Sequence, residues 1–271
     1  MDLSSLCALI LDMDGVLYRG ETPVAGAGDF LAWLAARGIP FLLVTNNSTL
    51  DPEAYQAKLA RMGIAVPAAQ ILTSGIATAD YLARNFSAQA RVYMVGESGL
   101  EHALRSRGFT LTSQDPDAVV VGMDRGLTYD KLRAATLAIR AGARFIATNP
   151  DRTLPTEAGL VPGAGAIVAA IAAATDRTPV VIGKPEPPLL EAALAQLGRP
   201  RACTALVGDR LETDIAGARR LGLPAILVLS GVTSEPPPPE SEVQPDWVFP
   251  SVRELHRAWE KSLAEASQPR P

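Results

Sequence analysis

Short apolar runs alternate along the chain with longer stretches in which apolar residues recur every three or four positions. The runs "LCALILD" and "PFLLVTN" enclose the helical stretch "GDFLAWLAARG", and "TPVVIGK", "TALVGD" and "PAILVLS" continue the alternation near the other end. Continuously apolar strands separated by helices are typical of a parallel sheet covered on both faces. Gly38, Gly63, Gly198 and Gly222 stand where the helices should stop. The pattern predicts an α/β fold with a Rossmann-like parallel sheet core.

A second group of alternating elements lies in the middle of the chain. It contains "RVYMVG", "AVVVGMD" and "RFIATN" with helical stretches between them, and it is long enough for a domain of its own. Because the polar strand ends lie on either side of it, we interpret it as an insertion. We expect core segments at 1–79 and 179–271, an inserted α/β cap domain at 80–178, and a frayed tail after Glu265. The run "SEPPPPESE" predicts a stiff surface loop.

Composition argues against nucleic-acid-binding proteins, membrane proteins and small disulfide-rich proteins. The 271 residues are 48% hydrophobic and carry a formal net charge of −4 with both signs interspersed, so we expect no nucleic-acid or membrane partner. The longest apolar stretch, "GAGAIVAAIAAAT", is too short to span a bilayer. Cys7 and Cys203 are expected to be unpaired residues of buried strands, and His102 and His256 to lie on helix surfaces. These features favour a cytoplasmic protein without a cleaved leader or a disulfide framework.

Polar residues suited to chemistry follow the predicted strands of the core. In an open α/β sheet, ligands bind outside the carboxyl ends of the strands. The first strand ends in Asp12 and Asp14, and two acids one residue apart repel each other unless a cation or a shared proton holds them. The other strand ends supply a hydroxyl–amide cluster, a lysine and two further acids: Thr45, Asn46, Asn47, Ser48, Lys184, Asp209 and Asp214.

Each of these residues also has a purely structural explanation. "TNNS" can cap the next helix, Thr213 and Asp214 can cap another, and a lysine after a strand is often a solvated turn residue. The residues taken together favour a functional interpretation over a structural one. Four different strand ends supply polar residues to one edge of the sheet, which is improbable by chance. We therefore predict a functional site at that edge.

The residue types indicate metal-assisted phosphoryl transfer. Clustered carboxylates without histidine or cysteine favour Mg²⁺, and a lysine with hydroxyl and amide donors suits a dianionic phosphoryl group. One aspartate of the first pair can attack phosphorus and form an aspartyl-phosphate. The other can protonate the leaving oxygen and afterwards deprotonate a water molecule. The two neighbouring acids then have different roles, while the metal and the lysine relieve their repulsion.

These residues, in this order, resemble the haloacid dehalogenase superfamily of phosphohydrolases. The resemblance rests on "DMDGV", the threonine of "TNNS", the lysine of "GKP" and the acids of "GDRLETD". The middle segment with "TNPDRTLPTEAGLVPGAGA" looks like the class IIA branch, which includes p-nitrophenyl phosphatases, NagD-like nucleotide phosphatases, phosphoglycolate phosphatases and pyridoxal phosphatases.

The resemblance implies a role for each residue of the site. Asp12 would be the nucleophile and Asp14 the general acid/base. Mg²⁺ would be held by Asp12, the backbone carbonyl of Asp14, and Asp209, with Asp214 as an outer acid of the metal site. The phosphoryl group would be bound by Thr45, Asn46, Asn47 and Lys184.

In this family the cap chooses the substrate. The stretch "NPDRTLPTEAG", residues 149–159, is rich in turn formers and predicts an exposed loop. Its Arg152 and Glu157 are expected to contact the leaving group of the substrate. Pyridoxal-type members offer a histidine near the place of Leu154, which disfavours pyridoxal phosphate. The resemblance also allows a homodimer formed through the cap.

We expect a phosphatase that hydrolyses small phosphomonoesters of the nucleotide, sugar phosphate, phosphoglycolate or p-nitrophenyl phosphate type. One alternative is a phosphotransferase or phosphomutase that uses the same aspartyl-phosphate. Another is a non-catalytic protein that binds phosphorylated ligands and resembles receiver domains, although these are far shorter and their extra acids precede the nucleophile. A third is dinucleotide binding through "GAGDF" or "PGAGA", but neither has the full glycine fingerprint directly after a strand.

Overall fold

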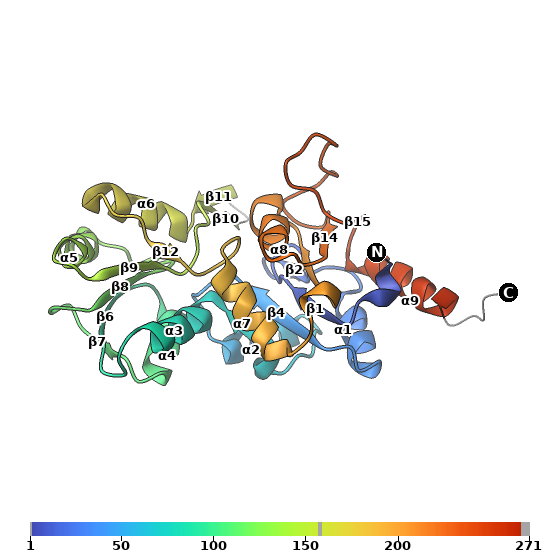
Figure 1. Ribbon diagram of the computed structural model, residues 1–271, viewed down its shortest axis with the longest axis horizontal. Coiled ribbons are helices and arrows are strands. Elements are labelled where there is room, and N and C mark those ends of the chain that lie inside the picture. Colours follow the sequence, from blue (N-terminus) through green and yellow to red (C-terminus); the bar gives the residue numbers. More distant parts are fainter. Residues whose placement is uncertain (1, 157–158, 267–271) are drawn as a thin grey trace. The chain divides into compact units, whose positions relative to one another are not determined.

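The computed structural model describes residues 2–156 and 159–266 (Figure 1). Contacts divide the chain into two compact units. The first unit comprises Met1–Val44, Gln56–Ile71 and Glu191–Pro271, and the second comprises Thr45–Tyr55 and Leu72–Leu190. Both units are built of parallel strands and helices, so the predicted α/β fold with an inserted second unit is confirmed. The boundaries 1–79, 80–178 and 179–271 stay a prediction.

The first unit is organised around a six-stranded sheet. In sheet order the strands are β15 (Trp247–Phe249), β14 (Ala225–Val228), β13 (Thr204–Gly208), β1 (Ala8–Leu11), β4 (Phe41–Thr45) and β5 (Ile71–Thr73). Strand β1 runs parallel to both of its neighbours, β13 and β4, and all four of its side chains are buried. A continuously apolar strand fits this central position, since both of its faces are covered.

Helices and short turns complete the first unit. Their bounds are η1 (Leu3–Ser5), the hairpin β2 (Tyr18–Arg19) and β3 (Thr22–Pro23), α1 (Ala27–Ala36), η2 (Ala68–Gln70), η3 (Arg201–Cys203), η4 (Leu211–Ile215), α8 (Ala216–Leu221) and α9 (Val252–Ala266). Helices α2 (Pro52–Arg61) and α7 (Pro187–Leu197) contain two of the four points at which the chain passes between units, and the other two lie in β4 and β5. Gly38 and Gly222 adopt positive φ angles of 64° and 67° where α1 and α8 end, as the sequence predicts.

One of the two predicted surface histidines is not on the surface. His102 is exposed on α4 (Ser98–Ser106), whereas His256 of α9 is half-buried among aromatic rings. Its ring centroid lies 4.7 Å from that of Trp33 and 5.6 Å from that of Phe30. Helices α1 and α9 pack together through these rings and Trp259. The prediction for His256 is therefore wrong, because this face of α9 is buried against α1.

The prediction that the two cysteines are unpaired is also wrong. Cys7 and Cys203 form a disulfide with a Cα–Cα distance of 5.2 Å. Both are half-buried and stand just before β1 and β13, where Ala8 pairs with Thr204. The parallel register thus brings together two cysteines that are 196 residues apart in the chain. The predicted cytoplasmic location loses the support that it took from unpaired cysteines.

The second unit contains a five-stranded parallel sheet. In sheet order its strands are β12 (Val180–Val181), β9 (Arg144–Ala147), β8 (Ala118–Val121), β6 (Arg91–Val95) and β7 (Thr110–Leu111). The run "TPVVIGK" predicts a strand of the core sheet, but its residues Val180 and Val181 pair with Ile146 and Ala147 of β9 instead. A half-buried two-residue strand carries no sequence signal for the sheet that it joins.

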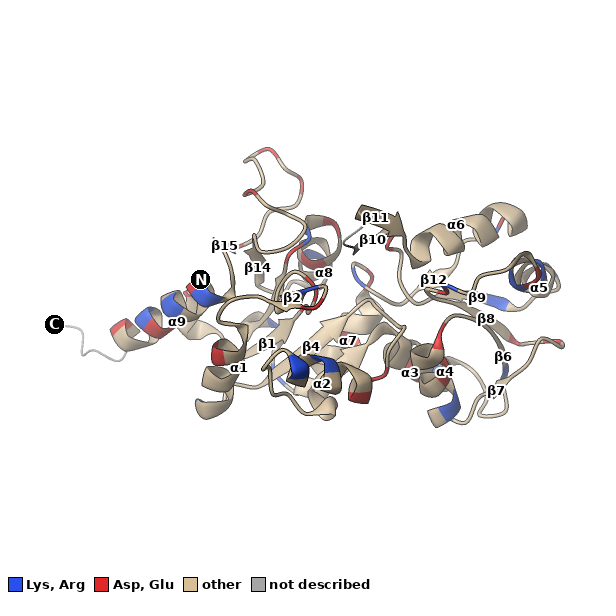
Figure 2. Cartoon of the chain, turned by 180° about the vertical axis from the view of Figure 1, so that it is seen from behind, with Lys and Arg blue, Asp and Glu red and all other residues tan. Residues whose placement is uncertain are grey.

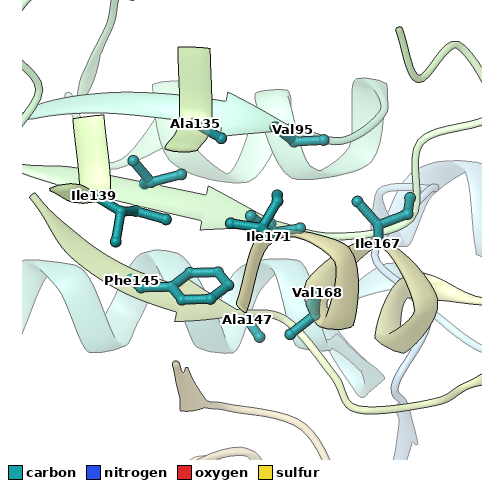
Figure 3. Close-up of a cluster of buried hydrophobic side chains, with 10 residues drawn as sticks. Val95, Ala135, Ile139, Phe145, Ala147, Ile167, Val168 and Ile171 are labelled. Atoms are coloured by element: carbon teal, nitrogen blue, oxygen red, sulfur yellow. The ribbon is translucent and has the colours of Figure 1, made fainter. Parts of the chain in front are cut away.

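Four helices flank this sheet: α3 (Ser74–Asn85), α4, α5 (Tyr129–Arg140) and α6 (Ala164–Thr175). Side chains of α5 and α6 pack over Phe145 and Ala147 of β9 in a closed apolar cluster (Figure 3). Helix α6 is the alanine-rich stretch of the sequence, and its buried residues recur at helical spacing: Ala164, Gly165, Ile167, Val168, Ile171 and Thr175. One face of α6 is therefore part of the core of the second unit, while Ala169, Ala170, Ala173 and Ala174 are exposed on the other.

The predicted loop at 149–159 is largely a β-hairpin. Strands β10 (Thr153–Thr156) and β11 (Gly159–Pro162) pair antiparallel, with Leu154 opposite Val161. Each strand is an edge of a two-stranded sheet, and edge strands tolerate the prolines that argue against a strand in the sequence. The predicted exposure holds in part: Arg152, Thr153 and Gly159 are exposed, whereas Leu154 is half-buried and Asn149 is only 3% exposed. Residues 157–158 lie outside the described part of the chain, as does the tail at 267–271.

The surface carries mixed charge. Figure 2 shows acidic and basic residues interspersed along α9. The proline-rich run at 234–242 forms a mostly exposed loop between β14 and β15, as predicted. Across residues 2–156 and 159–266, we find no helix with the length and apolar character that crossing a membrane requires.

Candidate active site

Three buried carboxylates gather at the carboxyl ends of two neighbouring strands in the first unit. Asp12 follows β1 and Asp209 follows β13, and these strands pair from Ala8–Thr204 to Leu11–Val207. The Asp12 amide continues the pairing by donating to the Val207 carbonyl at 2.9 Å. One carboxylate oxygen from each of Asp12, Asp209 and Asp214 lies within 4.8 Å of the other two. The predicted convergence of these three acids is thus a feature of the fold.

Asp209 is held by a tightly packed backbone. Its Oδ2 accepts a hydrogen bond from the Val232 amide at 2.6 Å. A Cβ atom on either Gly15 or Gly231 would collide with this carboxylate. Two constraints therefore require a glycine at position 15 of "DMDGV". The Asp209 carboxylate leaves no room for a Cβ, and the turn gives Gly15 a positive φ of 79°.

Asp214 is fixed from its own turn. It belongs to η4, a single turn with π-helical hydrogen bonding, and its Oδ2 accepts from the Arg210 amide at 3.1 Å. Gly208 leaves room for this carboxylate, since a Cβ there would overlap it. Asp214 is only 1% exposed, and its side chain is turned to Arg210. Asp214 thus satisfies an amide at the start of η4, the turn that leads into α8, and it also belongs to the buried acid cluster.

Asp14 stands apart from the buried cluster. It is exposed, and its Oδ2 accepts from the Tyr18 hydroxyl at 3.3 Å. Protein atoms displace water from around the carboxyl, and this desolvation raises the pKa of Asp14. Lys58, the Tyr18 hydroxyl and, more weakly, Arg210 act to lower it. A carboxyl with a raised pKa keeps its proton to higher pH, which suits a group that donates a proton.

The acid cluster fits a hard divalent cation. Asp12, Asp209 and Asp214 are 8%, 2% and 1% exposed, and three like charges that are this buried repel one another strongly. Carboxylate oxygens are the ligands that Mg²⁺ prefers, and no histidine or cysteine belongs to this group of ligand atoms. The donor set thus suits Mg²⁺ better than it suits a softer metal.

In the second unit, Asn46 and Lys184 form one hydrogen-bonded network. The Asn46 Nδ2 donates to the Lys184 carbonyl at 2.9 Å, and the Lys184 amide donates to Asn46 Oδ1 at 2.8 Å. Lys184 is 2% exposed and Asn46 is 7% exposed. The explanation of Lys184 as a solvated turn residue is therefore wrong. Gly183 permits the contact, because a Cβ there would press on Asn46 Oδ1.

The other residues of "TNNS" organise their own turn. Thr45 Oγ1 accepts from the Asn47 amide at 3.1 Å, and Asn47 Oδ1 accepts from the Thr49 amide at 2.9 Å. The cap of the following helix is Asp51, whose Oδ1 accepts from the Ala54 amide at 2.8 Å. "TNNS" is thus not needed to cap α2, and the functional interpretation keeps its support.

The sequence analysis missed two residues of this network, Asn149 and Asp151. The Asn149 Nδ2 donates to the Asn46 carbonyl at 2.7 Å, and Asn46 Nδ2 contacts both carboxylate oxygens of Asp151 at 3.2 Å. Both follow β9 in "TNPD", just as Asn46 follows β4 in "TNNS". The repeat of a Thr-Asn pair after a predicted strand, in "TNNS" and again in "TNPD", is the sequence feature from which these two residues could have been predicted.

The residues predicted for substrate choice lie at the hairpin. Arg152 is exposed immediately before β10, and Leu154 is half-buried within it. Glu157 lies outside the described residues. The glycines of "PGAGA" pack against the base of the hairpin, because a Cβ on Gly163 or Gly165 would collide with the Asp151 or Pro150 backbone. Close packing therefore accounts for these glycines without a dinucleotide.

Comparison with known proteins agrees with this geometry. The haloacid dehalogenase-like hydrolase family model matches residues 9–110, and a second model, described as HAD-hydrolase-like, matches residues 181–255. The acid sugar phosphatase of Staphylococcus saprophyticus is 42% identical over 255 residues, which are 94% of this chain and 98% of that protein.

Solved structures with this architecture include two from bacteria. NagD from Escherichia coli has a TM-score of 0.87 and 38% identity, with 92% of this chain and 98% of that chain covered. The 4-nitrophenylphosphatase of Thermotoga maritima has a TM-score of 0.87 and 37% identity, with 94% and 98% covered. The chain therefore belongs to the haloacid dehalogenase superfamily and is a phosphoric monoester hydrolase of its class IIA branch.

Proposed function

We propose that this protein is a Mg²⁺-dependent phosphatase that cleaves small phosphomonoesters through an aspartyl-phosphate. The observation that carries the proposal is the group of three buried carboxylates, Asp12, Asp209 and Asp214, with ligand atoms within 4.8 Å of one another. Three acids in so small a buried volume need a cation, and their oxygen donors suit Mg²⁺.

The metal would be held by Asp12, Asp209 and the backbone carbonyl of Asp14, with Asp214 as an outer acid of the site. When bound, Mg²⁺ supplies positive charge that offsets the negative charge of the phosphoryl group and of the acids. The remaining chemistry belongs to side chains of this chain.

Asp12 is the proposed nucleophile. Its carboxylate oxygen attacks phosphorus while the bond between phosphorus and the leaving oxygen breaks. Asp14 gives its proton to the leaving oxygen, and its raised pKa and its exposure support this role. In the second half-reaction Asp14 takes a proton from water as the water attacks the aspartyl-phosphate, which releases phosphate and regenerates Asp12.

Thr45, Asn46, Asn47 and Lys184 are the proposed ligands of the phosphoryl group. Lys184 supplies a cation for a dianion, and the Asn46 side chain fixes its backbone through two hydrogen bonds. Thr45 is the last residue of β4, the strand that pairs with β1 in the core sheet. Because ligands of α/β sheets bind at the carboxyl ends of the strands, this position supports the proposal.

The proposed substrates are small phosphomonoesters such as sugar phosphates and p-nitrophenyl phosphate. The names of the relatives, an acid sugar phosphatase and a 4-nitrophenylphosphatase, support this range. We further propose that the hairpin residues Arg152 and Glu157 contact the leaving group and affect substrate choice. Dimerisation through the cap and a cytoplasmic location stay predictions from sequence.

The test is phosphate release from a panel of phosphorylated metabolites and p-nitrophenyl phosphate, measured with Mg²⁺ and with excess chelator. The proposal expects turnover of small phosphomonoesters with Mg²⁺ and loss of turnover in chelator. Undiminished turnover in chelator would show that the reaction does not depend on a metal ion. Turnover that requires an added sugar acceptor would favour a phosphotransferase.

Substrate choice is tested with Arg152→Ala and Glu157→Ala. The kcat/KM for the preferred metabolite should fall more than that for p-nitrophenyl phosphate, whose leaving group is good and makes few contacts. Equal changes for both substrates, or no change, would argue against a specificity role for the hairpin.

A further inference from the structure

We infer that Asp151 is a positioning residue of the phosphoryl-binding network. Its carboxylate orients the side-chain amide of Asn46, and that amide fixes the backbone of Lys184. The inference rests on the proposed function, which makes Asn46 and Lys184 ligands of the phosphoryl group. It assigns to "NPD" a role separate from substrate choice by the hairpin that follows it.

The hydrogen-bond inventory of Asn46 carries the inference. A side-chain amide has two hydrogens on its nitrogen and an oxygen that only accepts. In Asn46, Nδ2 contacts the Lys184 carbonyl at 2.9 Å and both Asp151 oxygens at 3.2 Å. The Oδ1 atom accepts from the Lys184 amide at 2.8 Å. All polar atoms of the amide are thus used by these two residues.

An ionised carboxylate determines which way this amide faces. Asp151 can only accept, so the nitrogen of Asn46 must face it, and Oδ1 is then directed to the Lys184 amide. With the amide turned over, an oxygen would face the carboxylate and a nitrogen would face the Lys184 N–H. Asp151 therefore favours the same orientation that hydrogen-bonds both backbone groups of Lys184, and it adds the penalty of facing a carboxylate with an oxygen to the turned-over amide.

Asp151 is itself held in place from three directions. Its amide donates to Asn149 Oδ1 at 3.1 Å, and its carbonyl accepts from the Gly165 amide at the start of α6 at 2.8 Å. Gly163 and Gly165 approach this segment so closely that neither position has room for a Cβ. Asn149 also donates to the Asn46 carbonyl, which ties the same segment to the Asn46 backbone.

The charge of Asp151 acts on the Asn46 amide, and the hydrogen bonds of that amide hold the backbone of Lys184, a residue that is only 2% exposed. The conservative change Asp151→Asn keeps the size but removes the charge and lets either end of a new amide face Asn46.

The experiment uses the full-length Mg²⁺-loaded enzyme. It measures kcat and KM for p-nitrophenyl phosphate and the Ki of inorganic phosphate as a competitive inhibitor. For Asp151→Ala we expect KM and Ki to rise about ten-fold or more, the scale of one lost charged hydrogen bond, with a smaller change in kcat. Asp151→Asn should lie between this variant and wild type.

A matched control is Asp117→Asn. Asp117 also accepts a hydrogen bond in the second unit, from the Arg91 amide at 2.7 Å, but it has no contact with the network. This variant should leave KM and Ki unchanged. If Asp151→Ala does not fold, Asp151→Asn alone is compared with Asp117→Asn.

A double-mutant cycle with Asn46→Ala separates positioning from general damage. If Asp151 acts through Asn46, the double variant should have a phosphate Ki no higher than that of Asn46→Ala alone. Fold-changes that multiply, or a wild-type Ki in Asp151→Ala, would overturn the inference while leaving the proposed function intact. A wild-type Ki in Asn46→Ala would overturn the inference and remove Asn46 from the proposed ligands of the phosphoryl group, while the proposed phosphatase activity would still be judged by its dependence on Mg²⁺.

Discussion

Replacing Asp209 by asparagine should stabilise the metal-free protein, although it damages the metal site. The closest oxygens of Asp12, Asp209 and Asp214 are at most 4.8 Å apart. At an effective dielectric constant of about 20, two unit charges at this distance repel each other by about 3.5 kcal/mol. The substitution removes two of the three repulsions, which together amount to about 7 kcal/mol at this longest distance when all three acids are ionised. Asparagine can keep the hydrogen bond from the Val232 amide, since its side-chain oxygen also accepts.

The assay is urea unfolding in chelator and in Mg²⁺. In chelator, Asp209→Asn should have a higher free energy of unfolding than wild type. Mg²⁺ at about 100 times its dissociation constant should stabilise wild type by about 2.7 kcal/mol and the variant by much less.

Asp124→Asn is the matched control for this experiment. Asp124 is 5% exposed but has a cationic partner, since its Oδ2 lies 2.6 Å from Lys131 Nζ. Neutralising it should destabilise the protein in both conditions and leave the gain from Mg²⁺ unchanged. Loss of stability in Asp209→Asn, with the full gain from Mg²⁺ retained, would refute the reasoning about the acid cluster.

Three further predictions concern single residues and the disulfide. Asp12→Asn should lower kcat for p-nitrophenyl phosphate by about a thousand-fold or more with normal unfolding, and a variant with a tenth of wild-type kcat would exclude Asp12 as nucleophile. Lys184→Ala should lower kcat/KM by about a hundred-fold or more, because the dianion loses its cationic partner, and an unchanged kcat/KM would exclude that role. Cys7→Ser should lower the free energy of unfolding by up to about 5 kcal/mol, the chain-entropy value for a 196-residue separation, whereas an unchanged urea midpoint would show that the Cys7–Cys203 bond does not contribute.

The parts of the fold that depend on local pattern were predictable from the sequence. Strands such as Ala8–Leu11 and Phe41–Thr45 are apolar except for the final Thr45, and all of their residues are buried. Asp12 and Asp209 were predictable as neighbours because residues that follow parallel strands share one sheet edge. The helix stops at Gly38 and Gly222 were predictable because a positive φ favours glycine.

The parts that depend on distant partners were not predictable in the same way. The Cys7–Cys203 bond joins residues 196 apart, and only the strand register brings them together. Asp151 contacts Asn46 across 105 residues, so no local spacing reveals the pair. Val180 and Val181 could join either sheet, because a short strand does not encode its partner.

The proposed mechanism requires that Asp12 attack phosphorus. The most direct measurement quenches the enzyme during turnover of p-nitrophenyl phosphate with Mg²⁺, reduces it with borohydride, and sequences its peptides by mass spectrometry. Borohydride converts an aspartyl-phosphate to homoserine and leaves a free carboxylate unchanged. The account predicts homoserine at position 12 alone, dependent on substrate. Turnover without any reduced residue, or with reduction at another aspartate, would contradict it.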